Sequence, residues 1–230
     1  MIPVLILYVI KRLKKDSFLS KRIAGFKKLA IRLKLMFFLL VLTNSLAASE
    51  VPISKVITYN VLKNNVVIGT IKMNELMQGD SVTYTLESNI EAQYLLKFKI
   101  TGKELSIFKE GILIHSSVFR KVNNKVKSNH SISLKNGEYN LESFDKTSIL
   151  DLNPIKQNLV CMYFKEPLSV QNIFCDNLNK MVPVKAISNG VYKVEFSKGK
   201  YNLFHYKHGK CVKIEAFSPL FDVILIPAKS

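Results

Sequence analysis

Tryptophan is absent from this sequence, and glycine, proline and cysteine are sparse, with nine, seven and three residues respectively. So little glycine and proline excludes a collagen-like or low-complexity chain. The lack of tryptophan argues against a carbohydrate-binding protein, because such proteins usually present exposed flat aromatic rings, tryptophan above all. The three cysteines, Cys161, Cys175 and Cys211, cannot all pair. A disulfide between Cys161 and Cys175 and a set of three free thiols both remain open.

No catalytic or metal-binding motif is present either. The patterns G-x-S-x-G, C-x-x-C and H-E-x-x-H, the P-loop and the dinucleotide fingerprint are all missing. His205, His208 and Cys211 come nearest to a metal site, but strand alternation sends His205 and Cys211 in different directions and no further ligand is evident. We therefore expect no catalytic residue, no metal site and no cofactor, and we predict that the protein is not an enzyme.

Arginine is almost absent beyond the N-terminal region. Residues 48–230 contain 24 basic residues, and only Arg120 among them is arginine. Specific recognition of phosphates and bases favours the planar, bidentate guanidinium group. A surface of lysines instead indicates solubility or a loose attraction to anionic surfaces. The sequence therefore predicts no binding to nucleic acid.

Residues 1–47 have the features of a basic leader with a signal peptide. A stretch rich in lysine and arginine, 11–34, precedes an apolar run, 35–42, and a small-residue site at Ser45 and Ala47. This order is typical of a secretory signal peptide, and it predicts export with cleavage after Ala47. The apolar run is too short to span a bilayer, which needs about 20 residues. We expect no transmembrane span after cleavage.

The leader is longer than the usual signal peptide of about 15–30 residues. Translation that starts nearer Met36 would leave residues 1–20 unmade. An amphipathic leader that touches the membrane, or a retained signal anchor, would also account for the length.

Residues 48–230 show the alternation of β-strands between frequent turn signals. Segments 81–88 and 94–101 alternate most clearly, and turns are predicted at pairs such as Asn136-Gly137 and Gly102-Lys103. The spacing predicts an all-β domain, a strongly curved antiparallel sheet that forms an open half-barrel meander. The apolar faces of the two segments make a candidate ligand-binding surface, formed by Tyr84, Leu86, Leu96, Phe98 and Ile100.

One segment, 153–164, has helical spacing instead. Asn153 and Pro154 suit the N-cap and first position of a helix, and Ile155, Leu159 and Met162 recur at helical intervals. We expect one short helix here, with the sheet wrapped over it.

Three stretches resemble an uncharacterised group of exported Gram-negative bacterial proteins, the domain of unknown function 6134 family. They are VVIGTIKMNELMQGDSVTYTLES (66–88), LVCMYFKEP (159–167) and YNLFHYKHGKCVKIEAFSPLFDVILI (201–226). The resemblance covers about 55–228 and implies an unclosed barrel wrapped over a helix, distantly similar to periplasmic lipoprotein carriers, which hold acyl chains in the concave face. It implies location in the periplasm or at the cell surface, and it implies no enzyme activity.

Three function classes remain open from the sequence. The first is a carrier that binds an apolar, acyl-containing ligand in the concave face. The second is a structural or interaction protein of the cell envelope, with a protein partner and no small ligand. The third, which the absence of a catalytic motif disfavours, is an enzyme whose site is assembled from scattered residues.

Overall fold

The computed structural model describes residues 34, 51–93, 97–144, 146–219 and 222–229. The chain divides into two units, Met1–Ser49 and Glu50–Ser230. The apolar run of the leader and its predicted cleavage site lie outside the described residues. The second unit contains the β-structure.

In the described part of the chain, alternating sequence and short turns produce a single antiparallel sheet of 14 strands. The N-terminal half contributes β1 (Ile53–Lys63), β2 (Val66–Gln78), β3 (Ser81–Gln93), β4 (Lys97–Lys109), β5 (Ile112–Val122), β6 (Lys125–Lys135), β7 (Glu138–Ser143) and β8 (Lys146–Leu150). The C-terminal half contributes β9 (Asn172–Cys175), β10 (Lys180–Ser188), β11 (Val191–Ser197), β12 (Lys200–Lys207), β13 (Lys210–Phe217) and β14 (Val223–Pro227).

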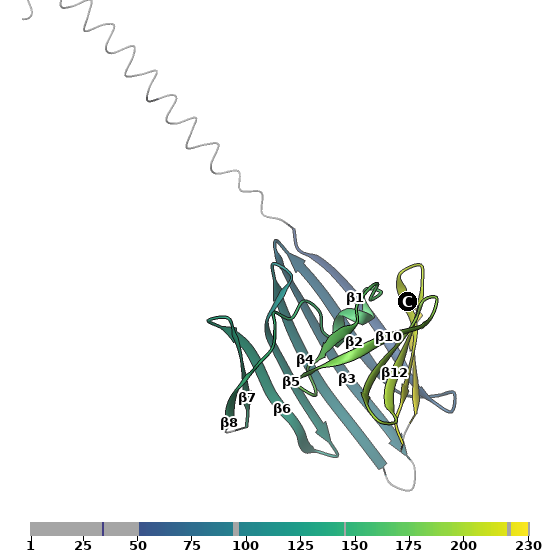
Figure 1. Cartoon of the computed structure of the whole chain (residues 1–230). Coiled ribbons are helices and arrows are strands. Elements are labelled where there is room, and N and C mark those ends of the chain that lie inside the picture. Colours follow the sequence, from purple (N-terminus) through teal and green to yellow (C-terminus); the bar gives the residue numbers. More distant parts are fainter. Residues whose placement is uncertain (1–33, 35–50, 94–96, 145, 220–221, 230) are drawn as a thin grey trace, which may run out of the picture. The chain divides into compact units, whose positions relative to one another are not determined.

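The sheet is open, as the sequence predicts. Its order runs from β8 down to β1, then from β14 back to β9, so β1 and β14 join the two halves. Figure 1 shows the long strands β1–β5 as a broad surface, with the C-terminal strands turned toward it, so that the sheet is strongly curved. Among the described residues β8 and β9 are edge strands, because each pairs with one neighbour only.

Several tight turns lie where asparagine and glycine predict them. Asn64 and Asn65, Asn123 and Asn124, and the pair Asn136-Gly137 have positive φ at both positions. A two-residue hairpin of this kind needs positive φ twice, which asparagine and glycine tolerate best. The residues of these turns therefore determine where one strand ends and the next begins.

The turn predicted at Gly102-Lys103 is wrong. Gly102 lies inside β4 and pairs with Ser88 of β3 and Arg120 of β5. The connection between β3 and β4 falls instead around residues 94–96, which lie outside the described part of the chain. Glycine at position 102 lets the Ser88 side chain lie close to the β4 backbone, because a Cβ on Gly102 would lie 2.7 Å from the Ser88 hydroxyl oxygen.

The helix predicted over 153–164 is also wrong in extent and type. Within 153–164 the structure has only a single turn of 3-10 helix, η1 (Leu159–Tyr163), preceded by extended backbone at Asn158. Backbone groups before it bond to strands: Leu113 N–H donates to the Ile155 carbonyl, and Phe174 N–H donates to the Gln157 carbonyl. These bonds to distant strands replace the i to i−4 bonds of a helix, and the apolar spacing reflects burial in the core.

Residues 151–178, here called the inner segment, include the edge strand β9 and pack against the concave face of the sheet. Figure 1 shows η1 between the long strands and the C-terminal strands. Val160, Met162 and Tyr163 of η1 are buried in one core cluster with Tyr59 and Phe204, among others. The sheet therefore wraps over an irregular segment with one helical turn.

A buried tyrosine ties the inner segment to the sheet. The Tyr139 hydroxyl donates to the Leu113 carbonyl and accepts from the Ile155 N–H, both at 2.9 Å. Its side chain is 1% exposed. The ring and the two backbone groups are therefore fixed together.

Replacing Tyr139 with phenylalanine is expected to lower the free energy of unfolding by about 1–3 kcal/mol, because two buried backbone groups lose their partner. Urea denaturation of the purified protein measures the change. Tyr201→Phe is the control, since the Tyr201 hydroxyl has no hydrogen-bond partner among the described residues, and it should shift stability by less than about 0.5 kcal/mol. Equal effects of the two changes would contradict this account of the inner segment.

Candidate functional site

A cavity of about 450 Å³ lies between the inner face of the sheet and the inner segment. The sheet contributes mainly apolar side chains, among them Ile71, Leu86, Ile90 and Ile100, and the inner segment contributes Leu159, Val160 and Tyr163. Ligand pockets of about 300–1,000 Å³ with apolar walls and a few polar groups are the usual sites for small molecules. This cavity has the size and lining of such a site.

The structure brings only part of the predicted ligand-binding surface together. Leu86 and Ile100 line the cavity. Tyr84 lies beside a smaller pocket and packs against Phe108 and Phe164, with ring centroids 5.9 and 5.3 Å away. Phe98 is half-buried on β4 and is not among the residues that line the cavity. Leu96 lies outside the described residues.

One wall of the cavity carries an ion pair. Arg120 of β5 and Glu104 of β4 both line it, and the Arg120 Nη2 atom donates to the Glu104 carboxylate at 3.1 Å. Their side chains are 34% and 21% exposed, so neither is fully hydrated. An ion pair inside an apolar cavity gives one end of it a polar character.

A buried carboxyl group closes the cavity on the side of the inner segment. The Asp176 carboxyl accepts hydrogen bonds from the Ser116 hydroxyl and, at 2.8 Å, from the Asn158 side-chain amide. The same amide nitrogen donates to Ser106 at 2.7 Å, and His130 Nε2 donates to the Asp176 backbone carbonyl at 2.8 Å. These bonds attach the inner segment to β4, β5 and β6.

The surroundings of Asp176 favour its protonated form. Asp176 is 5% exposed. Loss of hydration raises the pKa of its carboxyl group to about 7, and the nearby Glu104 carboxylate acts in the same direction, although the bonds from Ser116 and Asn158 oppose it. Asp176 is therefore a titratable group inside the core, at the boundary of the cavity.

All three cysteines are free thiols. Burial raises the pKa of Cys161 to about 12 and the pKa of Cys175 and Cys211 to about 11. A thiol is nucleophilic as the thiolate. These groups remain protonated near neutral pH and behave as small core residues.

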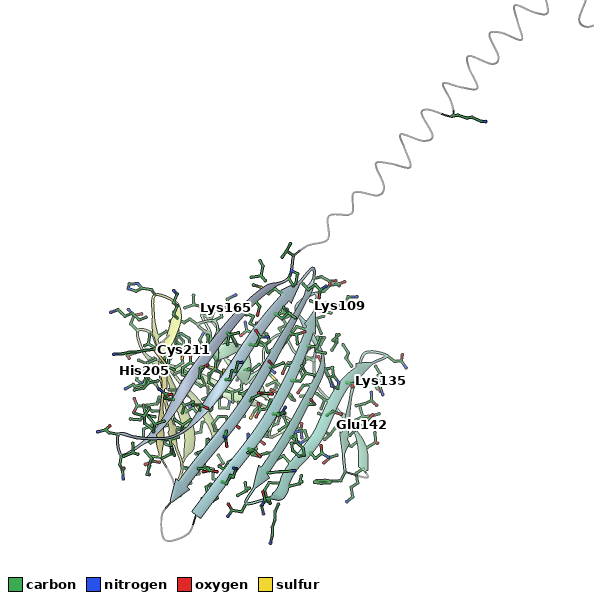
Figure 2. All side chains as sticks on the ribbon, turned by 180° about the vertical axis from the view of Figure 1, so that it is seen from behind. Lys109, Lys135, Glu142, Lys165, His205 and Cys211 are labelled. Atoms are coloured by element: carbon green, nitrogen blue, oxygen red, sulfur yellow. The ribbon has the colours of Figure 1, made fainter. Side chains whose placement is uncertain are left out.

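His205 and Cys211 diverge, as strand alternation predicts. Cys211 is buried in the core cluster, whereas His205 Nε2 lies 2.8 Å from a Glu215 carboxylate oxygen. Figure 2 shows both residues among the C-terminal strands. Within the described part of the chain, no three His, Cys, Asp or Glu side chains come together in a way that could hold a metal ion.

The sequence did not predict Glu104, Arg120 or Asp176 as residues of the site. A signal for Glu104 exists in hindsight: Ile100, Gly102, Glu104 and Phe108 share one face of β4, so a charge interrupts an otherwise inward-facing row. The misplaced turn at Gly102 concealed this alternation. No comparable local signal marks Asp176, because its partner Ser116 is 60 residues away in sequence.

No helix in the described residues is long and apolar enough to cross a membrane.

Comparisons with known proteins identify a family. No curated protein matches the chain. A crystal structure of a β-barrel-like protein of domain of unknown function DUF1849 from Brucella abortus is 11% identical, with a TM-score of 0.43 over 78% of this chain and 96% of that chain. The profile described as Domain of unknown function (DUF6134) matches residues 59–228. Because that match extends over most of the chain and nearly all of the sheet, the protein belongs to the DUF6134 family.

Proposed function

We propose that this protein binds an apolar, acyl-containing molecule in the cavity between the sheet and the inner segment. The observation that carries the proposal is the cavity itself, about 450 Å³ in volume and walled mainly by side chains such as Leu86, Ile90 and Leu159. The cavity is partly open to solvent, and lining side chains such as Ile90 and Ile100 are only half-buried, so apolar surface remains there for a ligand to cover. An apolar ligand would lose its contact with water on entering, which is the main favourable contribution to binding.

Filling the cavity tests this function. Ile100 lines the cavity and is half-buried, so Ile100→Trp places a larger ring in the space that the ligand would occupy. We expect the wild type to bind the uncharged fluorescent probe N-phenyl-1-naphthylamine saturably at micromolar concentration. The variant should bind it at least about tenfold more weakly, a loss of about 1.4 kcal/mol of binding free energy.

The control is Lys99→Trp, which adds the same ring one position away, on the opposite face of β4. Lys99 is exposed and pairs with Glu91 at the surface, so its replacement should leave probe binding unchanged. Absence of saturable binding in the wild type would contradict the carrier function and favour an envelope interaction protein. Wild-type affinity in Ile100→Trp would show that the probe binds elsewhere.

We propose further that the protein is exported, to the periplasm or the cell surface of a Gram-negative bacterium. The basic stretch, the apolar run and the small residues at Ser45 and Ala47 support this. N-terminal sequencing of protein recovered from the cell envelope should find a chain that begins at Ala48. A protein that keeps residues 20–40 would contradict cleavage and leave an anchored chain.

A further inference from the structure

Arg120 has an unusual place for a charged residue. It is the only arginine in residues 48–230, where every other basic residue is lysine. It lies on β5 opposite Gly102 of β4 and lines the cavity, whereas lysines such as its neighbour Lys121 lie outside that lining. Arginine is more weakly hydrated than lysine and suits partly buried ionic contacts.

The guanidinium group has donors to spare. It carries five N–H donors. Among the described residues its one hydrogen-bond partner is Glu104, which one Nη2 donor reaches at 3.1 Å. Glycine at position 102 leaves space beside the guanidinium group, because a Cβ there would lie 3.9 Å from the Arg120 Nε atom. The remaining donors are available to a ligand in the cavity.

The charges around the cavity favour an anion over a cation. Arg120 and Lys200 line it as cations, and Glu104 is the carboxylate that already pairs with Arg120. Asp176 also lines the cavity, and burial raises the pKa of its carboxyl group, which weakens its negative charge. A bound cation would therefore find no unpaired, fully charged carboxylate, whereas an anion would meet two positive side chains.

We infer that the ligand is an amphiphile with an anionic end, a carboxylate or a phosphate, and that Arg120 binds this end while the acyl chain contacts the apolar wall. Charge-assisted bonds between guanidinium and carboxylate or phosphate are stronger than neutral ones and often form in pairs. This inference rests on the proposed function and adds the chemical class of the ligand.

The test is displacement of N-phenyl-1-naphthylamine by four ligands that share one chain and differ in the end group: decanoate, decyl phosphate, decanol and decylammonium. In the wild type the anions should bind about tenfold or more tighter than decanol, and decylammonium weaker than decanol. The anion that binds more tightly shows whether the end group of the ligand is a carboxylate or a phosphate. Arg120→Gln should bring the anions to the affinity of decanol while decanol itself is unaffected.

Two further variants keep the result interpretable. Lys121→Gln removes the same charge from the next position of β5, outside the cavity lining, and should keep the preference for anions. If Arg120→Gln alone does not fold, because Glu104 loses its partner, Glu104→Gln with Arg120→Gln removes both charges together and should abolish the preference. Probe binding with equal affinity for decanoate and decanol would overturn the inference alone. No probe binding would overturn the proposed function with it.

Discussion

Asp176→Asn is expected to remove most of the pH dependence of stability between about pH 4 and pH 7. Burial raises the pKa of the carboxyl group from 3.8 to about 7, so the folded state binds this proton more tightly than the unfolded state. The stabilising contribution is complete below about pH 4 and is lost as the pH rises through 7. The difference between the two pKa values corresponds to about 4 kcal/mol in the free energy of unfolding.

Urea denaturation of the wild type and the variant at several pH values measures this effect. Asparagine preserves the size of the side chain, and Asn158 can turn its amide so that oxygen faces the new group, since the Ser106 hydroxyl can donate as well as accept. Asp151→Asn, at an exposed position of the inner segment, is the control and should retain the wild-type dependence. The same dependence in Asp176→Asn would show that Asp176 is ionised throughout.

Phe174→Ala is expected to lower the free energy of unfolding by about 3–5 kcal/mol, the usual cost of removing a buried aromatic ring. Phe174 lies on β9 and is fully buried in a core cluster with Phe108, Leu113 and Ile155, among others. Because β9 is part of the inner segment, the ring joins that segment to strands of the N-terminal half. Removing the ring leaves a cavity between the inner segment and those strands.

Phe144→Ala provides the comparison at a position that is 69% exposed, and it should change stability by less than about 0.5 kcal/mol. Denaturant midpoints of the two variants measure the difference. A small effect at Phe174 would mean that the inner segment is loosely attached and that its contacts with the sheet contribute little.

The meander could be predicted because its determinants are local. Asparagine and glycine at positions such as Asn64 and Gly137 adopt the positive φ that a tight hairpin needs. Alternation then assigns one face of each strand to the core. Neither step requires knowledge of distant residues, so strand order along the chain and the class of fold follow from the sequence.

The inner segment could not be predicted because its partners are distant. Ile155 makes its backbone bonds with Leu113 and with the Tyr139 hydroxyl, which decide against a helix although the local spacing favours one. Tertiary contacts override weak helical propensity in this way. The same spacing of apolar residues then serves an irregular segment that is buried on several sides.

The candidate site was predictable only in its apolar part. Leu86 and Ile100 follow from alternation within strands. The polar part of the site depends on the curvature of the sheet, which brings β4, β5 and the inner segment around one cavity. Only there do Arg120, Glu104 and Asp176 line the same space. Charged residues are mostly solvated, so neither the rarity of Arg120 nor the charge at Glu104 identifies a site residue in the sequence alone, and Asp176 has no local signal.

Native mass spectrometry of the protein purified from its own host tests the central claim most directly. The account predicts that the wild type carries an additional small mass, which dissociates on activation as an amphiphile with an acyl chain, and that Ile100→Trp purified in the same way carries none. A wild type with the mass of the polypeptide alone, or an equal additional mass on Ile100→Trp, would contradict a ligand held in this cavity.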